Sequence, residues 1–98
     1  MMLVRLLPAA EAEARDAVSW YEQQRPGLGM EFFAELDSTL FDLGQRPESF
    51  ERWPENERYR KTRLARFPYT LFFTVGDEVE VVAVAHSKRR PGYWLSRP

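Results

Sequence analysis

The chain has 98 residues, of which 44% are hydrophobic, 14% aromatic and 30% charged, and its formal net charge is −1. This composition is typical of one compact globular domain, which we place over residues 1–98, and it excludes a disordered or fibrous chain. Because the chain has no cysteine and one histidine, disulfides, thiolate catalysis and multi-histidine metal sites are excluded, and we expect no metal and no cofactor. No apolar run approaches the ~20 residues of a membrane helix, and the first residues are too short for a signal peptide, so we expect a cytoplasmic protein with no membrane partner.

The N-terminal quarter predicts a strand followed by an amphipathic helix. Residues 2–7 are nearly all apolar, which is typical of a short strand covered on both faces. Pro8 suits the first helical position, because the N–H that it lacks would be unpaired there anyway. Small and apolar side chains then recur at helical spacing over residues 9–24: Ala10, Ala14, Ala17, Val18 and Tyr21.

A second helix follows after a short break. The sequence Arg-Pro-Gly-Leu-Gly at 25–29 stops the first helix. A new apolar stripe follows, and Gly44 and then Pro47 end it. Because the connection is so short, the two helices should form an antiparallel hairpin. Aromatic residues of the hairpin are expected to pack between helix and sheet: Trp20, Tyr21, Phe32, Phe33 and Phe41.

The C-terminal half predicts three strands after a loop at 47–57. From Arg58 the pattern has a period of two, which places Lys61 and Arg63 on one face of a strand. Residues 69–75 are aromatic and β-branched, as in a strand. Residues 79–85 are so uniformly apolar that they should form a central strand. The tail from His86 to Pro98 is basic and aromatic and contains no regular element.

Together these elements predict an α+β fold with the order β-α-α-β-β-β. The helical hairpin should pack on one face of a small, mostly antiparallel sheet. The first strand should lie beside the apolar final strand, which would otherwise expose an edge.

The charges are segregated along the chain. Residues 1–57 hold twelve carboxylates against five arginines, net −7, and residues 58–98 hold nine Lys or Arg against three carboxylates, net +6. This predicts an acidic helical half and a basic C-terminal half, and the basic half can meet phosphates or an acidic protein.

Several motifs resemble, in their order and spacing, the RelE/ParE superfamily of toxins from type II toxin-antitoxin systems. They are Trp20-Tyr21-Glu22, Pro26-Gly27-Leu28-Gly29, Arg66-Phe67-Pro68-Tyr69 and the ending Ala83 to Trp94, with Arg97 after it. The resemblance covers nearly the whole chain, and the family's fold has the element order predicted above.

The resemblance implies a small toxin that forms a hetero-oligomer with a cognate antitoxin encoded beside it. The glycines between the helices and the Arg-Arg-Pro-Gly-Tyr-Trp ending are most similar to the ParE and plasmid-stabilisation branch, whose members inhibit growth by poisoning DNA gyrase. Two alternatives stay open. One alternative to the ParE-like toxin is a RelE-like endoribonuclease that cuts messenger RNA on the ribosome. The other is an inactive member that only binds its antitoxin and contributes to operator repression.

The RelE-like alternative requires groups for RNA cleavage. Without a metal, that reaction needs a base for the 2′-hydroxyl, an acid for the leaving oxygen and cations for the phosphorane. By resemblance to RelE-like enzymes, the candidates are Lys61, Arg63, Arg89, Arg90 and Tyr93. RelE-like nucleases often place an arginine where this chain has Thr70, and the pI of 5.8 is low for a protein that docks on ribosomal RNA. Both features favour the ParE-like interpretation.

The residues expected to bind the target or the antitoxin are Lys61, Arg63, Arg66, His86, Arg89, Arg90, Tyr93 and Trp94. Structural alternatives stay open for them. The strand cations can form a solvated face, Arg66 can pair with the acidic helices, and the lone His86 can be a hydrogen-bonded structural residue. Tyr93 and Trp94 can stack on a ligand or cap the edge of the core. We expect the antitoxin to cover the basic half with an extended segment rich in Asp and Glu.

Overall fold

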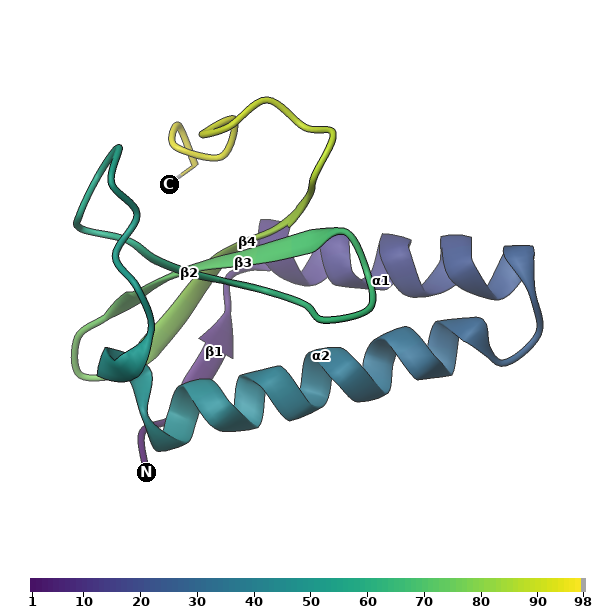
Figure 1. Ribbon diagram of the computed structural model, residues 1–98, viewed down its shortest axis with the longest axis horizontal. Helices are drawn as coiled ribbons and strands as arrows, with labels where there is room; N and C mark the ends of the chain where they lie inside the picture. The colour runs from purple at the N-terminus through teal and green to yellow at the C-terminus, as the bar shows by residue number, and fades with distance from the viewer. Residues whose placement is uncertain (98) are drawn as a thin grey trace.

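Two helices precede a three-stranded meander in the computed structural model, which describes residues 1–97 (Figure 1). The elements are β1 (Val4–Leu6), α1 (Pro8–Gln24), α2 (Leu28–Gln45), a 3-10 turn (Pro47–Ser49), β2 (Arg60–Arg63), β3 (Tyr69–Val75) and β4 (Val79–His86). Pro8 is the first residue of α1, as predicted. The predicted order and the α+β class are therefore confirmed.

The sheet has the strand order β1-β4-β3-β2. β1 runs parallel to β4, and the other two pairings are antiparallel. The prediction that the first strand lies beside the last is confirmed. The expectation that this strand is covered on both faces is wrong, because Arg5 is exposed and its guanidinium contacts Glu78 and Glu80.

β2 starts at Arg60, two residues after Arg58, where the alternating pattern of the sequence predicted the start of the strand. Tyr59 is used by the preceding loop, since its N–H donates to Asn56 C=O at 3.0 Å and its C=O accepts the Trp53 N–H at 2.8 Å. Arg60 then faces the helices and donates to Phe50 C=O at 2.7 Å, which ties the loop to the strand. The register pairs Lys61 with Phe72 across the sheet.

Each face of the sheet has its own core. The larger core joins both helices to the sheet through side chains such as Phe32, Leu36, Leu71 and Phe73. The smaller one lies on the opposite face and consists of Trp53, Phe72, Ala83, Ala85 and Trp94. The C-terminal segment crosses this second face, on the side of the sheet away from α2 (Figure 1).

A bulge in β4 sets which side chains reach each core. Phe72 pairs with Ala83 but Phe73 pairs with Val81, so Val82 is an extra residue on β4. The extra residue reverses the alternation, and Ala83 and Ala85 therefore face the second core. These small side chains leave room there for large aromatic rings.

The connection between the helices is built around Glu22. Its carboxylate accepts the N–H groups of Gly27 at 2.9 Å and Gly29 at 3.0 Å, which satisfies donors at the start of α2. Gly27 has φ of 90°, in the left-handed region that favours glycine. Two motifs noted in the sequence are thus parts of one helix cap.

Candidate functional site

The basic residues of β2 lie on the sheet face opposite the helices. Lys61 is opposite Phe72, whose side chain is in the second core, so Lys61 and Arg63 share that face. Arg63 is opposite Thr70, and Thr70 is opposite Ala85. Arg63 therefore lies in the row of residues next to the point where the chain leaves β4.

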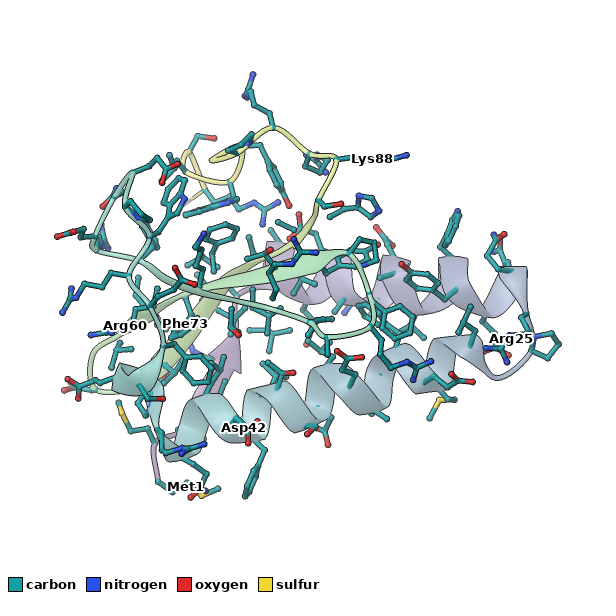
Figure 2. All side chains as sticks on the ribbon, in the orientation of Figure 1. Met1, Arg25, Asp42, Arg60, Phe73 and Lys88 are labelled. Carbon is teal, nitrogen blue, oxygen red and sulfur yellow. The ribbon has the colours of Figure 1, made fainter. Side chains whose placement is uncertain are left out.

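Three more cations follow directly after β4, namely Lys88, Arg89 and Arg90, and all are exposed. Figure 2 shows Lys88 extending away from the body of the protein. Together with Lys61 and Arg63 they form what we call the basic surface. Within residues 1–97, none of these five cations forms an ion pair with a carboxylate. The basic surface is thus left with an uncompensated positive charge.

Arg66 does not belong to the basic surface. Its guanidinium lies 2.8 Å from the carboxylate of Glu31 on α2, and hydrogen bonding to that carboxylate raises the pKa of Arg66. Its backbone N–H also donates to Glu35 on α2 at 3.1 Å. This is the pairing with the acidic helices that the sequence left open.

Trp94 lies in the second core with 2% of its surface exposed. Its ring centroid is 4.7 Å from those of Tyr59 and Phe72 and 5.2 Å from that of Trp53. A ring enclosed in this way cannot stack on a base or on a partner's side chain. Of the two alternatives for Trp94, the structure has the one in which it caps the core.

Tyr93 is connected to α1 through Glu13, a residue that the sequence analysis missed. The Tyr93 hydroxyl donates to the Glu13 carboxylate, which also accepts from the Arg97 guanidinium at 2.7 Å and from the Val84 N–H at 2.9 Å. One signal was present in the sequence. Glu13 lies three residues after Ala10, and so interrupts the small apolar stripe of the helix with a carboxylate.

These contacts shift the pKa values of Glu13 and Tyr93 in opposite directions. Partial burial alone would raise the pKa of Glu13, but hydrogen bonds from Arg97, Tyr93 and the Val84 N–H outweigh it, and the pKa is lowered. Burial, followed by the hydrogen bond to the Glu13 carboxylate, raises the pKa of Tyr93 to about 12. Tyr93 therefore holds its proton at neutral pH and is a poor general base.

Arg89 stacks on the Tyr93 ring, with its guanidinium carbon 3.8 Å from the ring centroid. Both residues line a cleft of about 400 Å³ between α1 and the segment that follows β4. Trp20 on α1, which is 55% exposed, forms part of the opposite wall. The cleft therefore combines an exposed aromatic ring with an unpaired guanidinium.

His86 also lines the cleft and has structural partners. Its Nδ1 accepts the Lys88 N–H at 3.0 Å, and its ring packs edge-on to Tyr69 at 5.0 Å. The first contact fixes the turn from which the three cations project.

The helical hairpin carries a second hollow, an apolar groove of about 740 Å³ between α1 and α2. It is lined mainly by Leu6, Ala14, Val18, Phe33, Leu36 and Leu40. Phe33 is 49% exposed, and Phe41, in an adjoining hollow with Met1 and Leu3, is 58% exposed. The expectation that Phe33, Phe41 and Trp20 pack between helix and sheet is wrong, because these side chains lie outside the contact faces of their helices.

The structure thus combines a helical hairpin on a four-stranded mixed sheet with a basic surface and a separate apolar groove. Residues 4–91 match the family model described as the ParE toxin of the type II toxin-antitoxin system parDE. The chain therefore belongs to the ParE toxin family. No helix within residues 1–97 is long and apolar enough to cross a membrane.

A solved structure entitled "Chromosomal ParDE TA system from P. aeruginosa" contains a chain with a similar fold, at a TM-score of 0.79. The two chains are 20% identical, and the match covers 90% of this chain and 98% of that one. At this identity the likeness shows the fold alone. No curated protein matches the sequence of this chain.

Proposed function

We propose that this protein is the toxin of a type II toxin-antitoxin pair, that it inhibits DNA gyrase in the cytoplasm by binding to it, and that a cognate antitoxin neutralises it. Membership of the ParE family supports the toxin role. The observation that favours binding over RNA cleavage is the Tyr93 hydroxyl, which donates to the Glu13 carboxylate and is thus already engaged within the protein.

The nuclease candidates are also a poor match to acid-base chemistry. RNA cleavage needs a base that accepts the proton of the 2′-hydroxyl near neutral pH. Tyr93 keeps its proton, and the other candidates, Lys61, Arg63, Arg89 and Arg90, are cations that donate rather than accept. An exposed, unpaired basic surface fits the capture of an anionic partner better than proton transfer.

A supercoiling assay tests the proposed target. Purified toxin should inhibit gyrase, and a stoichiometric amount of antitoxin should reverse this inhibition. Arg89→Ala should weaken the inhibition, because the change removes an exposed cation next to the cleft. Unchanged supercoiling at saturating toxin, together with growth arrest in cells and new messenger RNA ends within translated codons, would instead assign the RelE-like activity.

We also propose that the antitoxin occupies the apolar groove with one face of an amphipathic helix. A groove between two helices accepts such a helix through residues at i, i+3, i+4 and i+7. Glu22 and Asp37 line the groove, so basic residues should flank the apolar face of the bound helix. The acidic antitoxin segment predicted from the sequence would then cover the basic surface.

A further inference from the structure

The β4 strand has an edge that no other strand covers. Within the part of the chain that the structure describes, residues 1–97, β1 pairs only with residues 79–81, so residues 82–86 have no strand neighbour on that side. The Val84 N–H and the Val82 C=O point toward this edge, where each needs a hydrogen-bond partner because burial without one is costly. The segment that crosses the second face of the sheet supplies one of the partners.

Glu13 and Arg97 together close this edge. Glu13 Oε1 accepts the Val84 N–H at 2.9 Å, and Arg97 Nη1 donates to the Val82 C=O at 2.9 Å. The two side chains also pair with each other, with Arg97 Nη2 2.7 Å from Glu13 Oε2. Their side chains are 17% and 23% exposed, so little water competes for these contacts. The pair joins α1, β4 and the C-terminal segment at one point.

The same carboxylate holds Tyr93, and Tyr93 holds Arg89. Glu13 Oε2 accepts the Tyr93 hydroxyl, and the Arg89 guanidinium carbon lies 3.8 Å above the Tyr93 ring. A guanidinium held on a ring loses less conformational freedom when it binds an anion than one that moves freely in solvent. Arg89 has no carboxylate partner within residues 1–97, so its N–H groups are available for binding.

We propose that Glu13 is a positioning residue. Through Arg97 and Tyr93 it latches the C-terminal segment onto α1, and it thereby presents Arg89 to a carboxylate of the target protein. The second part of this inference rests on the proposed function. The latch itself rests only on the contacts of Glu13.

The surroundings of Arg89 favour a protein carboxylate over a nucleic-acid backbone. Asp16 and Glu13 line the same cleft beside Lys88 and Arg89, so the cleft has mixed charge and lacks the continuous row of cations that a run of phosphates requires. A single carboxylate on a protein loop can instead pair bidentately with Arg89 while the rest of the loop packs against Trp20.

Amide hydrogen exchange tests the latch on the free protein. Glu13→Gln removes the negative charge at nearly the same size, and we expect the amides of Val84 and residues 93–97 to exchange at least tenfold faster. Glu11→Gln is the control, because Glu11 lies on the same helix but is exposed, and its one ion pair among residues 1–97 is with Arg15. Equal exchange in wild type and Glu13→Gln would overturn the latch.

A double-mutant cycle on gyrase inhibition and on growth arrest tests the positioning of Arg89. If Glu13 acts through Arg89, Glu13→Gln should cost at least tenfold in inhibition in the wild-type background and nothing further in the Arg89→Ala background. Independent, multiplying losses would mean that Glu13 is merely structural and would overturn the proposal. Duplex DNA bound by the toxin alone, and lost in Arg89→Ala, would overturn the carboxylate as its ligand.

Tyr93→Phe is the second variant, in case Glu13→Gln does not fold. It keeps the ring under Arg89 and removes only the bond to Glu13, while the Arg97 contacts of Glu13 remain. We therefore expect faster exchange of residues 93–97 and a loss of inhibition between that of wild type and that of Glu13→Gln. Inhibition equal to that of wild type would mean that Glu13 does not position Arg89 through Tyr93. A wild-type chain that inhibits neither gyrase nor growth would overturn the proposed function and the role of Arg89, whereas the exchange result decides the latch in either case.

Discussion

Glu13 accepts hydrogen bonds from three residues far along the chain, Val84, Tyr93 and Arg97, and its ionisation should therefore affect the stability of the fold. Its pKa is lowered from 4.5 in the folded protein, so the ionised form stabilises the fold above that pH, and this stabilisation is lost as the pH falls through the lowered value. Glu13→Gln should lower the free energy of unfolding by about 1.5–3 kcal/mol at neutral pH, the range for hydrogen bonds to a charged group.

The measurement is urea unfolding of wild type and Glu13→Gln at pH 7 and near pH 3. The difference between the two proteins should shrink at the lower pH, because pH 3 lies below 4.5, where the carboxyl of the unfolded wild-type chain binds a proton and the unfolded state is favoured. A difference of the same size at both pH values would mean that the charge of Glu13 does not stabilise the fold.

For single residues, the sequence predicted on which face of an element a side chain lies, but it did not predict which distant residue the side chain contacts. The period of two placed Lys61 and Arg63 on one strand face, because that depends only on local geometry. The role of Glu13 depends on a chain segment about 80 positions away that has no regular pattern, and so it could not be predicted. The choice between the two roles of Trp94 likewise depended on where the loop around Trp53 would lie.

Among the elements, the helical hairpin depends on one close approach. A Cβ added at Gly29 would lie 2.6 Å from the Val18 carbonyl oxygen and 2.9 Å from Glu22 Oε1, so α2 would have to move away from α1. Gly29→Ala should therefore destabilise the protein by about 1–3 kcal/mol, as overpacking does elsewhere. Gly76→Ala is the matched control, because a Cβ there meets nothing within 4 Å.

Thermal unfolding of the two variants checks this expectation. If Gly29→Ala and Gly76→Ala both melt close to the wild-type temperature, the helices can move apart with little loss in the free energy of unfolding.

The elements were more predictable than their ends and their exposed faces. Helical spacing and the Gly and Pro signals located both helices, since these are local properties. The late start of β2 and the bulge at Val82 result from tertiary contacts. Phe33 and Phe41 were expected to be buried, yet they are 49% and 58% exposed, because Phe33 lines the open groove between the helices and Phe41 lines the hollow beside it.

For the molecule as a whole, the apolar groove belongs to the helical hairpin, whereas the basic surface lies around the C-terminal segment on the far side of the sheet from α2 (Figure 1). If the antitoxin helix fills the groove, Phe33→Asp should weaken the complex by roughly 2–4 kcal/mol, as loss of an aromatic anchor does. Met30→Asp is the control, since Met30 is also exposed on α2 but does not line the groove. Titration calorimetry measures both, and equal losses would contradict a specific site in the groove.

The basic surface should contribute to antitoxin binding in a different way, which salt can reveal. Arg90 is exposed and has no ion pair within residues 1–97, so an acidic antitoxin segment can pair with it on binding. If the bound antitoxin encloses Arg90, Arg90→Glu should weaken the complex by about 2 kcal/mol or more. If Arg90 instead stays at the rim of the interface, most of the loss in affinity should disappear in 0.5 M salt, because exposed charges are screened.

Arg46→Glu is the matched control for this change. Arg46 is exposed at the end of α2, forms no ion pair within residues 1–97 and lies outside the basic surface. Both substitutions change the net charge by the same amount, so any effect of overall charge on association is common to the two variants. Calorimetry at 0.1 and 0.5 M salt should therefore separate a local contact from general attraction. Equal losses of affinity in Arg90→Glu and Arg46→Glu would mean that only the total charge of the toxin affects antitoxin binding and that the antitoxin contacts the groove alone.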